Sequence, residues 1–318
     1  MKANYYIESM PFCEVFDKYI MKLFEDEFYI LPDKNVTKKQ IPAEKAEDAM
    51  IEFLNIGRKY YYGEEINNAE LMGFFEKYGL LGFLDDFSAN KYYTVSDAVV
   101  LRRCNLITKK DAIMKIDLLE YMKIFFPRLK ETQIIKKIKD CNKILSEPET
   151  EVIKNYELNR NLIFSEEYGE PLRMITDYAQ ILYGALRATT IEDEYQRINP
   201  IISMNGLGNQ INRVPTEMGV RFNTLKQGID YNFLMHITQD VPTLKACKYC
   251  GRAFIASNPK AEYDTPSCKN KANVYKSRGK VLGKNMIFRD DGTIATKRIM
   301  PSEELSQYFV DAFTKKRK

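Results

Sequence analysis

The chain has 318 residues, of which 45% are hydrophobic and 29% charged, and its formal net charge is only +4. This composition is typical of a folded protein and excludes wholesale disorder. No apolar stretch approaches the roughly 20 residues of a membrane-spanning helix, and residues 1–16 lack the apolar segment of a secretory signal, so we expect no membrane partner and a cytoplasmic location.

The first 240 residues are expected to form a mainly helical body. Apolar residues recur at helical spacing, and capping residues mark several ends: Asn67 or Asn68 before one helix, Gly79 after it, and Pro127 after another. Two short strands are predicted at 5–8 and 28–31. The predicted helices cover residues 43–60, 67–78, 112–126, 129–145, 171–188 and 222–239.

The rest of the chain is predicted to hold two smaller units. The stretch 198–219 is rich in Asn and Gly and is expected to be irregular, and a boundary is expected at 241–243. We divide the chain into a helical domain (1–240), a zinc-finger-like module (245–282) and a C-terminal unit (283–318). In that last unit, a hairpin of 286–288 with 294–297 precedes a basic helix over 301–313. The expected fold class is therefore mainly α, with a small treble-clef finger and a short hairpin and helix at the end.

The expected finger is defined by cysteine spacing. Three of the six cysteines fall within 22 residues, and Cys247 and Cys250 form a Cys-x2-Cys pair followed by Gly251. Such a pair supplies two zinc ligands from one turn, and Asp264 and Cys268 can add two more at the start of a helix. A knuckle, a hairpin and a ligand-bearing helix together describe a treble clef. The ion would be structural, because a module of this size has too small a core to fold alone.

The identity of the fourth ligand is left open by the sequence. Asp264 stands where a fourth cysteine would be expected, and aspartate does bind zinc. Three cysteines with a water or another ligand, or a metal-free site in which Asp264 only caps the helix, are the alternatives. His236 is the only histidine; it precedes the knuckle on a predicted helix, where a core or surface role is the favoured interpretation.

This stretch resembles the CGNR-type zinc finger. The matching positions are Cys247, Cys250, Phe254, Tyr263, Cys268, Asn270, Lys271, Asn273, Tyr275 and Arg278. The resemblance covers about a tenth of the chain, and Asp264 departs from the family pattern. It implies a bacterial transcription regulator in which the finger follows a helical ABATE domain, which residues 1–240 resemble more weakly.

The charge distribution favours a nucleic acid as the partner. DNA is expected rather than RNA, although the sequence itself leaves that choice open. Residues 245–318 hold 17 Lys or Arg against 7 Asp or Glu, a balance of +10, so the remainder carries −6. Cations bind phosphates, while Asn273 and Arg278 can also read base edges. The predicted contact residues are Lys248, Arg252, Lys269, Lys271, Asn273, Lys276, Arg278 and Lys280.

Two other function classes were weighed. In the first, the protein serves interaction or structure: the body binds a partner, and the finger is only a stabilising cap. If the finger binds nucleic acid instead, the body is expected to form a homodimer or to sense a signal. In the second it is an enzyme, which would need converging His, Glu, Asp or Cys side chains. With one histidine and no recognisable catalytic motif, we expect no catalysis.

Overall fold

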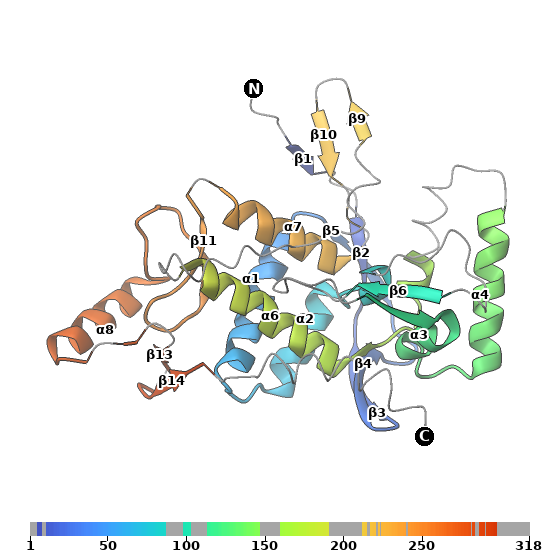
Figure 1. The fold of residues 1–318 in the computed structure, drawn as a ribbon, viewed down its shortest axis with the longest axis horizontal. Helices are drawn as coiled ribbons and strands as arrows, with labels where there is room; N and C mark the ends of the chain where they lie inside the picture. Colours follow the sequence, from blue (N-terminus) through green and yellow to red (C-terminus); the bar gives the residue numbers. More distant parts are fainter. Residues whose placement is uncertain are drawn as a thin grey trace.

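The computed structural model describes residues 5–7, 11–86, 98–102, 113–146, 160–190, 212–214, 217–220, 222, 224–239, 241–280, 282–283, 286–289 and 291–297. Helices form the centre of the molecule (Figure 1). The cysteine-rich module with helix α8 lies at one end, and helix α4 lies at the other. No helix among these residues is long and apolar enough to cross a membrane.

Four helices make the central layer, and α1 contacts the other three. α1 and α6 pack closely because Gly57 has no side chain: a Cβ there would lie 2.1 Å from the Ala179 carbonyl oxygen. Aromatic side chains such as Phe53, Phe75 and Tyr183 fill the core between the helices. The four are α1 (Lys45–Tyr61), α2 (Asn68–Tyr78), α6 (Leu172–Thr190) and α7 (Leu225–Ile237).

These helices confirm the central predictions for the body. Asn67 caps α2 by accepting a hydrogen bond from the Ala69 N–H, and Gly79 ends the helix at a positive φ of 86°. The predicted helix over 129–145 is present as α4 (Glu131–Ser146). The predicted basic helix over 301–313 lies outside the described residues.

Small sheets line the helical layer, and the sequence predicted only part of them. β2 (Pro11–Phe16) pairs with β5 (Lys38–Pro42), and β4 (Glu27–Pro32) lies between β3 (Tyr19–Phe24) and β8 (Glu170–Pro171). Within residues 1–240, only the segments 5–8 and 28–31 were predicted as strands. The "mainly α" class is therefore confirmed only in part: helices predominate, but they combine with several small sheets.

Two other segments also differ from prediction. The expected helix 112–126 begins as a strand, β7 (Ile113–Asp117), which pairs with β6 (Ala98–Arg102), and only α3 (Leu118–Phe125) is helical. The stretch 198–219, expected to be irregular, contains β9 (Asn212–Val214) and β10 (Glu217–Val220), and β10 also pairs with β1 (Tyr5–Ile7). Strand pairing between distant segments provides hydrogen bonds that local periodicity does not reveal.

A buried carboxylate anchors the loop after α2. Glu170 is fully buried and accepts hydrogen bonds from the N–H groups of Leu81 (2.9 Å), Gly82 (2.5 Å) and Phe83 (3.1 Å). The Tyr168 hydroxyl donates a fourth bond at 2.8 Å. Burial raises the pKa of Glu170 to about 6, although these four donors act in the opposite direction.

We predict that Glu170→Gln destabilises the fold and changes its pH response. The amide NH2 would face buried N–H groups and leave at least one unsatisfied, at a cost of about 1–3 kcal/mol. Because the folded-state pKa of Glu170 lies above its usual 4.5, its contribution is complete below pH 4.5 and is lost as pH rises through 6. The difference in unfolding free energy between the parent and Glu170→Gln should therefore shrink by about 2 kcal/mol between pH 4.5 and pH 6. Urea unfolding at a series of pH values measures this difference. A deficit that does not change with pH would contradict this assignment.

Candidate metal centre

The cysteine knuckle is a tight turn between two strands. β11 (Leu244–Ala246) enters it and β12 (Ala253–Ile255) leaves it, and the two strands pair antiparallel. The turn is closed by the Cys247 N–H, which donates to the Arg252 carbonyl at 2.8 Å, and by the Gly251 N–H, which donates to the Cys247 carbonyl at 2.9 Å. Gly251 has a φ of 73°, a conformation that favours glycine. The knuckle predicted from sequence is therefore present.

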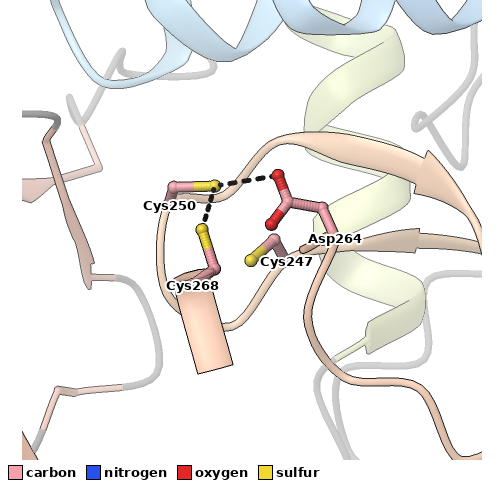
Figure 2. Close-up of side chains that lie close together, drawn as sticks. All are labelled: Cys247, Cys250, Asp264 and Cys268. Atoms are coloured by element: carbon pink, nitrogen blue, oxygen red, sulfur yellow. Dashed lines mark hydrogen bonds between the residues drawn. The ribbon is translucent and has the colours of Figure 1, made fainter. Parts of the chain in front are cut away.

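The other two candidate ligands lie at the start of α8 (Pro266–Ser277). Thr265 caps this helix by accepting a hydrogen bond from the Cys268 N–H at 3.2 Å, and Pro266 occupies its first turn. These features place Cys268 in the first turn, facing the knuckle. Figure 2 shows the Asp264 side chain entering the same space from the loop before the helix.

The four side chains converge with dimensions close to those of a tetrahedral site. The ligand atoms of Cys247, Cys250, Asp264 and Cys268 all lie within 4.8 Å of one another. The Sγ atoms of Cys250 and Cys268 are 3.7 Å apart, and Cys250 Sγ lies 3.5 Å from Asp264 Oδ2 (Figure 2). A zinc ion with Zn–S of about 2.3 Å and Zn–O of about 2.0 Å requires edges of about 3.8 Å and 3.5 Å. The residues therefore form a group that could hold a metal ion with three sulfur ligands and one oxygen.

Protonation is unevenly distributed over the cluster. Hydrogen bonding from Cys250 lowers the pKa of Cys247 to about 7 against the effect of burial. The hydrogen bond to Cys247 and burial raise the pKa of the Cys250 thiol, and burial raises the pKa of Cys268 to about 11. Burial acts to raise the pKa of Asp264, but hydrogen bonds from the three thiols outweigh it and leave that pKa below its usual value. Metal binding therefore competes with protons held by the thiols.

An aromatic stack closes the outer side of the module. Phe288 comes from β13 (Met286–Phe288), which pairs with β14 (Ile294–Thr296) in the hairpin predicted from sequence. Its ring stacks on Tyr249 of the knuckle at 5.0 Å between centroids and on Tyr275 of α8 at 4.2 Å. Phe254, one of the positions that match the finger pattern, is only partly buried here. Phe288 was missed because a hairpin predicted locally does not reveal where it docks.

The helical body holds the back of the knuckle by hydrogen bonds. The Asn55 side chain of α1 accepts a hydrogen bond from the Ala253 N–H at 2.9 Å and donates one to the Ala253 carbonyl at 3.3 Å. Arg58 donates to the Cys250 carbonyl at 3.2 Å while it pairs with Glu64, and the Tyr183 hydroxyl donates to the Gly251 carbonyl at 2.5 Å. These contacts fix the turn that carries two ligands to two helices of the core. No sequence motif signalled them, since each partner is distant along the chain.

The predicted nucleic-acid contacts fall on the exposed parts of this module. The half-buried side chains of Cys268, Ala272 and Tyr275 form the inner face of α8. Lys248 is exposed but pairs with Glu262 at 2.5 Å. The remaining predicted contacts are all exposed: Arg252, Lys269, Lys271, Asn273, Lys276, Arg278 and Lys280.

His236 takes no part in the cluster. Its Nδ1 lies 2.7 Å from Thr243 Oγ1 and its Nε2 lies 3.0 Å from Glu47 Oε2. The ring therefore links α7 to α1 and to the segment entering β11. This position agrees with the structural role favoured from sequence.

No protein-family model matches the chain, and neither does any curated protein or solved structure. The resemblance to the CGNR-type finger therefore stays a prediction. What can be stated of the site comes from its own geometry.

We predict that the purified protein holds about one metal ion per chain in the cluster and that Cys268→Ser abolishes this. In chelator competition, Asp264→Cys should have a zinc dissociation constant at least about tenfold lower than that of the parent, because thiolate is a better zinc ligand than carboxylate. Elemental analysis and chelator competition measure both quantities.

Glu262→Gln is the matched control for this series. It removes an exposed carboxylate two residues from Asp264 that lies outside the cluster, so metal content should equal that of the parent. Equal metal content in the parent and in Cys268→Ser would overturn the assignment of the site.

Proposed function

We propose that this protein binds nucleic acid through a zinc-stabilised finger, with α8 as the contact helix and the helical body as its support. The observation that carries the proposal is a cluster of four possible metal ligands at the N-terminus of α8, a helix whose lysines are exposed. Three sulfurs and one oxygen suit zinc, which favours such mixed tetrahedral sets in structural sites. Phosphate backbones are the polyanions that a cationic helix face of this kind binds.

The cations on α8 support this proposal because they are not neutralised within the finger. Lys269, Lys276 and Arg278 have no carboxylate within ion-pairing distance among the described residues. Lys271 and Lys280 lie over the rings of Tyr249 and Tyr275, at 6.0 and 5.6 Å from the centroids. An unpaired surface cation gains more from a phosphate than one already held by a carboxylate, since no existing pair must be broken.

A second candidate is a structural or protein-interaction role, in which the finger only caps the helical body. The hydrogen bonds of Asn55, Arg58 and Tyr183 to the knuckle favour it, because they hold the finger against the core. Under this alternative the cations of α8 are a solvated face. Salt dependence separates the two candidates, since only phosphate binding releases counterions.

We predict that the full-length, zinc-loaded protein binds nucleic acid at low salt and that Lys269→Ala/Lys276→Ala/Lys280→Ala weakens binding to every sequence. The slope of log K against log salt should fall by about 2.7 in magnitude if all three lysines contact duplex phosphates. Fluorescence anisotropy over a salt series measures affinity and slope together.

Lys130→Ala/Lys136→Ala/Lys139→Ala is the matched control. It removes the same charge from exposed lysines on or next to α4, at the opposite end of the molecule (Figure 1). This variant should keep the affinity and slope of the parent. Equal losses in both triple variants would point to net charge alone, and no binding by the parent at low salt would leave only the structural role.

A further inference from the structure

The outermost line of α8 is formed by uncharged hydrogen-bonding side chains. Cys268, Ala272 and Tyr275 mark the inward direction. At 100° per residue, the opposite direction falls on Asn270, Asn273 and Ser277. All three are exposed, and neither asparagine makes a side-chain hydrogen bond to another described residue. We call Asn270, Asn273 and Ser277 the polar ridge.

Cations flank the polar ridge on both sides. The same helical geometry places Lys269 and Lys276 along one side and Lys271 along the other, where the exposed Val274 lies next to the ridge. Arg278 and Lys280 follow directly after the end of the helix at Ser277. A neutral centre between two cationic borders is the pattern expected of a helix that lies between two phosphate backbones. Phosphate contacts then set the position of the helix, and the central side chains meet base edges.

The dimensions and composition favour duplex DNA over the other nucleic acids. α8 has 12 residues, so it is about 18 Å long, and a helix fits the B-DNA major groove of about 12 Å. The major groove of an RNA duplex is too narrow for side chains to read. Single strands are usually held by stacking on exposed aromatic rings, but Tyr249 and Phe288 are buried, and the other rings of the module are only partly exposed: Phe254, Tyr263 and Tyr275.

We propose that α8 enters the DNA major groove and that Asn270 and Asn273 read bases there, with a preference for adenine. This inference rests on the proposed nucleic-acid binding and specifies its target. Asparagine can form two hydrogen bonds with adenine, through N6 and N7, and this pairing discriminates against other bases. Asn270 matched the family pattern in the sequence, but only Asn273 was among the predicted contacts.

Selection from a random duplex library by the full-length, zinc-loaded protein, followed by anisotropy titrations, tests the inference. The selected sites should share at least one fixed A·T pair. Asn270→Ala/Asn273→Ala should lose about tenfold or more in affinity for the selected duplex while it keeps the parent's affinity for an unrelated duplex and the parent's salt slope. Ser267→Ala, an exposed position off the ridge, is the matched control and should bind as the parent does.

The possible results distinguish base reading by α8 from the proposed nucleic-acid binding on which it rests. If the parent binds only single strands or RNA, or if the double asparagine variant keeps full preference for the selected duplex, base reading by α8 is wrong and nucleic-acid binding stands. If the parent binds no nucleic acid at all, both fall. Circular dichroism and metal content equal to the parent's would show that the variants retain the finger.

Discussion

The convergence of three sulfurs and one carboxylate oxygen at a single point is the constraint on which the finger depends. The Cys247–Cys250 knuckle and the start of α8 are joined by a loop with little regular structure. The four side chains of the cluster meet between these two segments, which the stack of Tyr249, Phe288 and Tyr275 also links. With a zinc ion, the cluster would carry a net charge of about −2 at the N-terminus of α8, where the helix dipole favours negative charge. The geometry thus orients α8 outward while its first turn is fixed.

The core of the helical body supports this arrangement from behind. Asn55 and Arg58 of α1 and Tyr183 of α6 bind backbone atoms of the knuckle. On the other side, Arg289 beside the hairpin approaches Glu64 at 3.8 Å, and Glu64 also pairs with Arg58. The module is therefore held on two sides by groups that do not contact the cluster's ligand atoms. These bonds set the orientation of the cysteine knuckle relative to the helical body.

Sequence reasoning succeeded where local chemistry decides structure. Asn67 and Gly79 bounded α2 correctly, because caps act over a few residues. The ligand set was found because cysteine spacing reports directly on metal chemistry. Reasoning failed where partners are distant: β2 and β5 pair across some 25 residues, and Phe288 fills the finger from a hairpin beyond it. The lysines that were predicted as contacts on α8 are exposed, and the inward position of Tyr275 places Asn270 on the opposite face.

X-ray absorption at the zinc edge of the loaded protein tests the central claim most directly. The account predicts about three sulfur neighbours at about 2.3 Å and one oxygen at about 2.0–2.2 Å. The oxygen shell should be replaced by a fourth sulfur in Asp264→Cys. A shell of nitrogen and oxygen atoms without sulfur, or a spectrum unchanged by that substitution, would contradict the account.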